Sequence, residues 1–138
     1  MRSRLLSSAL VAIAALVAFW GAPVKAHHSF AAEFDASKPI ALKGVVTQID
    51  WANPHVWFYI NVKDEDGRMV RWASEMGAPH QLQGRGWLRE TMKVGDVVSV
   101  EGSLSRDGAK RLNARIVTTA DGKRMGAASS GDPTTRQQ

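Results

Sequence analysis

The sequence predicts an all-β protein, namely a five-stranded OB-like Greek-key barrel with one short helix between strands three and four, preceded by a signal peptide. Three observations indicate this fold, and the first two are that short segments alternate between apolar and polar residues and that glycine-containing turns separate them. The third is the order of the elements, which is three strands, a helix and two strands. An open antiparallel sandwich is the alternative.

Residues 1–26 are predicted to be a cleaved signal peptide. Two arginines precede an apolar run at residues 5–20, and small residues end at Ala26, where the cut is expected. The run is shorter than the ~20 apolar residues that span a bilayer. We therefore expect a periplasmic or secreted protein that begins at His27 and has no membrane partner after cleavage.

The composition excludes several classes of protein. The 138 residues suffice for one modest domain, and the absence of cysteine excludes disulfides, thiolate zinc sites and cysteine nucleophiles. The formal net charge is +5, but the leader holds three of the 18 basic residues and none of the 13 acidic ones. Cleavage thus removes much of the basic character, and together with export this argues against a nucleic-acid partner.

Five segments have the residue pattern of strands. In the first, Gly44 marks a bulge or bend, because Val46 and Ile49 continue one apolar face only if a residue is inserted. The dipeptide Asp66-Gly67 predicts a tight hairpin between the second and third strands. Pro79 suits the first position of a short helix. The expected strands are residues 40–49, 56–62, 68–75, 97–105 and 110–119, and the expected helix is residues 78–84.

One domain is expected over residues 40–125. Residues 27–39 before it are polar and mixed, which predicts an extended arm. Residues 126–138 after it are rich in Gly, Ser, Pro and charge, which predicts a disordered tail. Burial of side chains such as Phe58 and Ile60 is expected to hold the domain together without disulfides.

Four motifs resemble those of a family of small secreted bacterial proteins classed as a domain of unknown function. The motifs are H-H-S-F-A-A-E-F-D from His27, N-P-H-V-W from Asn53, R-G-W from Arg85 and V-G-D-x-V from Val94. The resemblance implies an exported single domain with an OB-like fold. It implies no catalytic residue, because no reaction is established for that family.

The expected cleavage predicts a metal site, because it makes His27 the first residue. A terminal histidine offers its free amine and its Nδ1 to one metal, and a second histidine completes a planar three-nitrogen set that suits Cu(II). This resembles the histidine brace of copper oxygenases and periplasmic copper carriers. His55, after a rigid Asn-Pro pair, is the favoured second ligand. The alternatives are His28, or His80 with Met76, a softer pair that would suit Cu(I).

An aromatic surface gives a second hypothesis, an interaction module. Trp57 and Tyr59 share a face with His55, and Trp72 is expected nearby, so strands two and three could stack a sugar or a peptide. Burial of these rings is the alternative. No nucleophile elbow, phosphate loop or carboxylate pair is recognisable, so we expect a binding module and not an enzyme. A copper-dependent oxidase or oxygenase is the third hypothesis.

Overall fold

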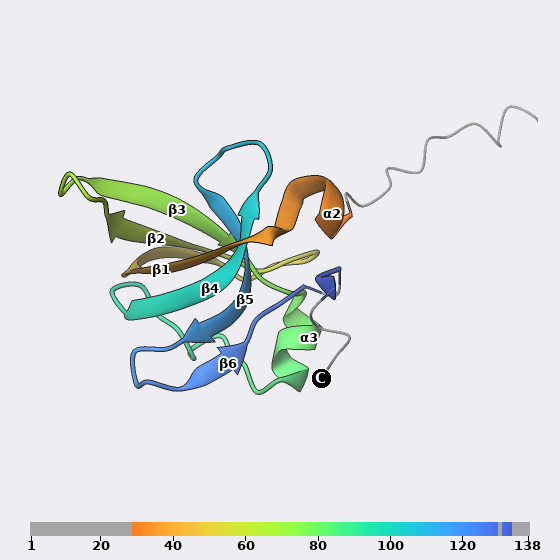
Figure 1. Cartoon of the computed structure of the whole chain (residues 1–138). Coiled ribbons are helices and arrows are strands. Elements are labelled where there is room, and N and C mark those ends of the chain that lie inside the picture. The colour runs from red at the N-terminus through yellow and green to blue at the C-terminus, as the bar shows by residue number, and fades with distance from the viewer. Residues whose placement is uncertain (1–28, 130, 134–138) are drawn as a thin grey trace, which may run out of the picture.

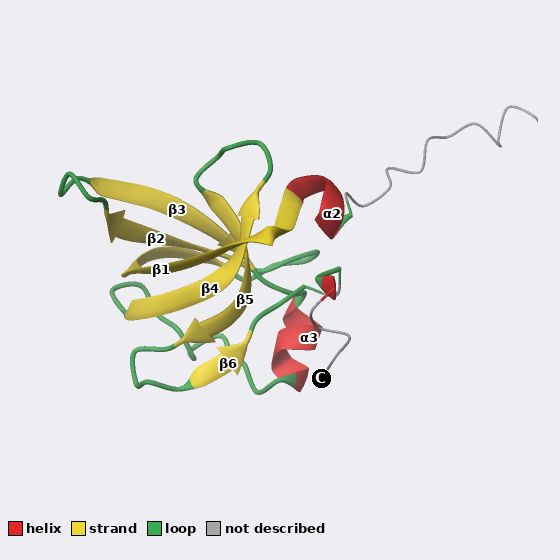
Figure 2. Ribbon diagram, viewed as in Figure 1, coloured by secondary structure: helices red, strands yellow, loops and turns green. Residues whose placement is uncertain are grey.

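The computed structural model describes residues 29–129 and 131–133. In this part of the chain the strands form one strongly curved sheet (Figure 1). Two short helices lie at the end of the strands opposite the β2–β3 hairpin turn (Figure 2). The elements are α2 (Phe30–Glu33), β1 (Phe34–Asp50), β2 (Trp57–Lys63), β3 (Met69–Glu75), α3 (Pro79–Gly84), β4 (Val97–Ser105), β5 (Arg111–Thr118) and β6 (Arg124–Gly126). Within the described ranges, no helix has the length and apolar character needed to cross a membrane.

The sheet closes on itself. Its hydrogen-bonded order is β3-β2-β1-β4-β5-β6, and β3 pairs in addition with β5. That extra pairing is parallel and joins residues 73–75 to residues 111–113, so β1 to β5 form a closed ring of pairings. The all-β class and the order of three strands, a short helix and two strands are confirmed.

A sixth strand joins the five that the sequence predicts. β6 follows a turn in which Gly122 has a φ of +85°, and it pairs with the last residues of β5. The prediction of five strands is incomplete here because β6 has three residues, too few to show an alternating pattern.

β1 is a long strand that changes partner along its length. Residues 34–45 pair with β4, and residues 45–50 pair with β2. Gly44 lies where the partner changes, and a Cβ at this position would overlap the backbone carbonyl of Asn61. The glycine is therefore required by the close approach of two backbones.

The extra residue expected in β1 is Thr47. The register with β2 shifts between Val46 and Gln48, which leaves Thr47 without a partner residue in the pairing. Val46 is fully buried and Ile49 packs against the same core cluster, as the predicted insertion requires. The bulge thus lies three residues beyond Gly44, where it was predicted.

The apolar core fills the inside of the ring. The alternation in β2 places Phe58 and Ile60 at 0% exposure, as predicted. Leu82 of α3 and Trp87 after it are equally buried and belong to the same cluster. The Trp87 indole donates its N–H to the Gly126 carbonyl at 2.8 Å, which ties the residues after α3 to β6.

Both ends of the domain differ from the expected arm and tail. Residues 30–33 form α2, and β1 begins at Phe34 instead of residue 40. Ala127 and Ala128 are buried in the segment expected to be disordered. The Gly77 amide donates to the Ala127 carbonyl at 2.8 Å and Arg85 donates to the Ala128 carbonyl at 2.6 Å, which holds this segment down. The predicted leader, His27, His28 and residues 130 and 134–138 lie outside the described residues.

Candidate functional site

Among the residues that the structure describes, the candidate site is centred on a contact between His55 and Glu75. The Nδ1 atom of His55 lies against the Oε1 atom of Glu75, and the two side chains are 35% and 7% exposed. The backbone fixes this contact, because Trp57 is paired with Glu75 at the ends of β2 and β3. The pairing continues past the strands, where the Met76 amide donates to the Val56 carbonyl at 2.8 Å.

The carboxyl group of Glu75 is electrostatically unusual. Burial raises the pKa of Glu75 to about 7; the charge of Glu33 adds to this rise and the charge of Arg111 opposes it. The contact with His55 requires a proton between Nδ1 and Oε1, whichever atom carries it. Because Nδ1 is occupied in this way, Nε2 is the ring nitrogen through which His55 would bind a metal ion.

Asn113 adds a buried amide beside Glu75. It is paired with Glu75 in the parallel β3–β5 pairing and is 1% exposed. Its Nδ2 donates to the Ser129 hydroxyl at 3.1 Å, whereas its Oδ1 has no hydrogen-bond partner in the described part of the chain. The segment after β6 therefore packs beside the candidate site, which helps to explain why Glu75 is shielded from water.

Arg111 connects α2 to the same end of β5. Its guanidinium lies 3.9 Å from the Glu33 carboxylate, 3.0 Å from Asp107 and 5.6 Å from the centre of the Phe34 ring. Glu33 is in turn close enough to Glu75 to raise its pKa. These contacts hold the beginning of the described chain at the end of the molecule where His55 and Glu75 lie.

The other predicted metal ligands are placed apart from this pair or are not described. His80 is exposed on α3, whereas Met76 is fully buried in the core, so they do not form one surface site. Among residues 29–129 and 131–133, no group of three histidine or acidic side chains could hold a metal ion. A complete site would need donors from outside these residues, where His27 and His28 lie.

Glu75 was not predicted as a site residue from the sequence. The hairpin pattern contains the signal that could have found it, because a turn at Asp66-Gly67 places the end of β3 opposite the beginning of β2. The residue opposite Trp57 is then Glu75, next to the loop that carries His55. The burial of Glu75 could not be predicted from the hairpin pattern, because it depends on β5, α2 and the segment after β6.

The predicted aromatic surface is divided between two faces. Trp57 and Tyr59 lie half-buried on the outside of β2. Trp72 is paired with Ile60, faces the core and is 8% exposed. The Arg71 guanidinium lies 4.4 Å from the centre of the Tyr59 ring and partly covers it. The structure therefore does not place Trp72 in one platform with the other two rings.

The described residues define an all-β protein with a histidine–carboxylate pair at one end of its closed sheet. The family of unknown function DUF6152 matches residues 14–114, which is most of the chain. The protein belongs to this family, and the predicted membership of a domain-of-unknown-function family is confirmed. No curated protein matches the chain.

Proposed function

We propose that this protein is an exported binding module with an OB-type barrel that holds a metal ion, Cu(II) by preference, through His27 and His55. In this proposal residues 1–26 are removed and the protein acts in the periplasm or outside the cell. It binds the ion and catalyses no reaction of its own.

The observation that carries the proposal is the contact of His55 with Glu75. Histidines that bind metals in proteins commonly donate the second ring N–H to a carboxylate, which fixes the orientation of the ring and makes the other nitrogen a better ligand. A buried carboxylate on Nδ1 of a part-exposed histidine is the arrangement that such a ligand needs.

The position of α2 supports His27 as the second ligand. Ser29 is the first described residue, and the contacts of Glu33 and Arg111 hold α2 at the end of the sheet that carries Glu75. Only His28 lies between Ser29 and His27 in the sequence, and the two steps along the chain span at most about 7 Å. A mature chain that begins at His27 would therefore present its terminal amine and imidazole near α2.

The strand order supports the OB-type barrel. In that fold a bent first strand pairs with both halves of the sheet, and a helix lies between strands three and four. β1 pairs with β2 and with β4, α3 follows β3, and β3 meets β5.

Copper titration of protein that begins at His27, followed by electron paramagnetic resonance, tests the proposal. We expect a nitrogen-rich Cu(II) spectrum that His55→Ala changes and weakens, whereas His80→Ala, on exposed α3, leaves it unaltered. Glu75→Gln should weaken binding 10- to 100-fold, because it removes the charge that orients the ring. Equal binding by protein with one alanine added before His27 would show that the terminal amine is not a ligand. Mass spectrometry of the exported protein checks the first residue.

The second candidate function is a carbohydrate- or protein-interaction module that uses the outside of β2. Trp57 and Tyr59 support it, because both rings remain half-exposed on that face, and Arg71 over Tyr59 adds a charge to the surface. Replacing both rings by alanine should abolish binding in a glycan or peptide array while thermal stability changes little. A collapsed fold would show that the rings are structural.

A further inference from the structure

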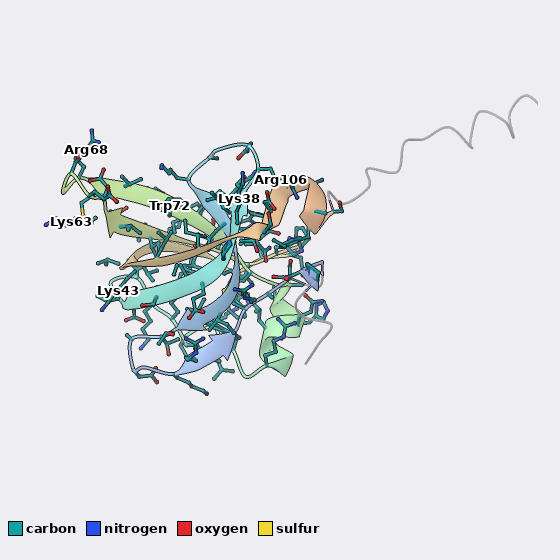
Figure 3. The ribbon with its side chains drawn as sticks, viewed as in Figure 1. Lys38, Lys43, Lys63, Arg68, Trp72 and Arg106 are labelled. Carbon is teal, nitrogen blue, oxygen red and sulfur yellow. The ribbon has the colours of Figure 1, made fainter. Side chains whose placement is uncertain are left out.

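A groove lies at the hairpin end of β3, away from Glu75. It has a volume of about 680 Å³, within the range of about 300–1,000 Å³ typical of small-molecule sites. Figure 3 shows Lys63 and Arg68 near the β2–β3 turn and Trp72 farther along β3. The lining residues are Leu42, Val62, Lys63, Asp64, Glu65, Arg68, Met69, Val70, Trp72 and Lys110.

The groove forms because the strands separate at this end of the ring. The β1–β2 pairing ends at Val45 and Asn61, and the β3–β5 pairing begins only at Ala73. Core-facing side chains beyond those points are therefore left uncovered by a neighbouring strand. Leu42, Val62 and Val70, which pack against the core but remain partly exposed, form an aliphatic floor with Trp72.

The basic side chains at the rim of the groove differ in whether a carboxylate lies beside them. Arg68 is paired with Asp64 at 3.4 Å and with Asp66 at 2.6 Å. Lys63 and Lys110 form no ion pair with any carboxylate of the described residues, and the Lys110 ammonium lies 5.2 Å from the centre of the Trp72 ring. Glu65 also lines the groove and is exposed on the hairpin turn. The side of the groove beside Trp72 therefore carries a cation without a counter-charge.

We propose that this groove binds a small amphipathic carboxylate, with its aliphatic chain on Leu42, Val62 and Val70 and its head group at Lys110. The aliphatic floor favours a hydrocarbon chain over a sugar ring, which needs an open aromatic face. The ammonium above Trp72 favours an anionic head group over a cationic one. This site is separate from the His55–Glu75 pair and does not depend on metal binding.

Calorimetric titration with decanoate, below its micelle concentration, tests the site in the metal-free protein. We expect decanoate to bind and to shift the indole N–H signal of Trp72 in a proton–nitrogen correlation spectrum. Lys110→Glu should weaken decanoate binding about tenfold or more, because it places a negative charge beside the head group. Lys123→Glu makes the same change of charge in the exposed turn before β6 and should leave the affinity unaltered.

Two further probes distinguish the contribution of the hydrocarbon chain to binding from that of the carboxylate head group. Acetate, which lacks the hydrocarbon chain, should not bind measurably, and decyltrimethylammonium should bind more weakly than decanoate. The proposal is overturned if the ammonium probe binds as well as decanoate, if Lys110→Glu binds like the wild-type protein, or if decanoate leaves the Trp72 signal in place. Far-ultraviolet circular dichroism of both variants confirms that each is folded.

Discussion

At the scale of single residues, the contact between His55 and Glu75 provides a buried carboxyl group with a partner. A buried carboxyl is stable when protonated or when a proton is shared with a close partner. His55 provides that partner from the loop before β2. Because burial raises the pKa of Glu75 to about 7, the contact is sensitive to pH near neutrality, and its behaviour is measurable without any ligand.

Glu75 should make the metal-free protein less stable as the pH rises from about 4.5 to about 7. Its pKa is about 7 in the folded chain and near 4.5 when unfolded, so the native state binds the proton more tightly. The destabilisation is fully developed above pH 7 and reaches up to about 3 kcal/mol. Glu75→Gln should remove this part of the pH dependence, as measured by urea unfolding at several pH values. A wild-type slope that Glu75→Gln leaves unchanged would contradict the assignment, and Glu90→Gln at an exposed position is the control.

Phe58 should be one of the largest single contributors to stability. Its ring is 0% exposed in the middle of the core, so Phe58→Ala leaves a cavity that surrounding residues cannot fill. We expect a loss of about 3 to 5 kcal/mol in urea unfolding. Met69→Ala, at a side chain that is 58% exposed, should change stability by less than about 0.5 kcal/mol. Similar losses for the two variants would refute the assigned inner face of β2.

At the scale of elements, the bend of β1 depends on a backbone contact that a side chain cannot enter. β1 can pair with both β2 and β4 because Gly44 allows the Asn61 carbonyl to approach. The bulge at Thr47 then restores the alternation for Ile49. Two local irregularities together let one strand belong to both halves of the ring.

Gly44→Ala should therefore destabilise the protein by about 1 to 3 kcal/mol or more, because the new Cβ collides with backbone atoms that cannot rotate away. Gly84→Ala is the matched control, since a Cβ at the end of α3 meets nothing within 4 Å. We expect it to be neutral or slightly stabilising. Thermal unfolding of the two variants compares them directly, and an equal effect of both would contradict the crowding at Gly44.

The elements were predictable from the sequence to the extent that their causes are local. The alternation in β2, the Asp66-Gly67 turn and Pro79 at the first position of α3 each depend on a few neighbouring residues, and each predicted its element. β6 and the ordered Ala127 depend on distant partners, since the Ala127 amide donates to the Arg115 carbonyl at 2.8 Å. The same reason applies to the candidate site, where His55 was predicted and the burial of its partner was not.

At the scale of the whole molecule, the two ends of the described chain pack together beside the ring. Phe30 of α2 lies against Gly131, and the Ser129 hydroxyl accepts a hydrogen bond from Asn113. The segments before β1 and after β6 therefore belong to the domain and cover the outside of the β3–β5 pairing. The domain is larger than the predicted residues 40–125.

Removal of residues 127–138 should lower stability by several kcal/mol, because it exposes apolar surface and leaves the Gly77 amide and the Asn113 side chain without their partners. Urea unfolding of the shortened protein measures the loss. The truncation should also increase the exposure of the Glu75 side chain and lower its pKa toward the ordinary value of a glutamate. An unchanged unfolding midpoint would show that this segment contributes nothing to the domain.

The parallel pairing of β3 with β5 is the shortest join in the ring, with residues 73–75 facing residues 111–113. We expect the shortest pairing of a closed sheet to open most often, so amide hydrogens there should exchange ahead of those in β1 and β4. Glu75 lies within the β3–β5 pairing. Binding of a metal ion to the His55 imidazole is therefore energetically linked to the opening of the β3–β5 pairing. Metal binding should slow amide hydrogen exchange along β5 as well as in the loop that carries His55.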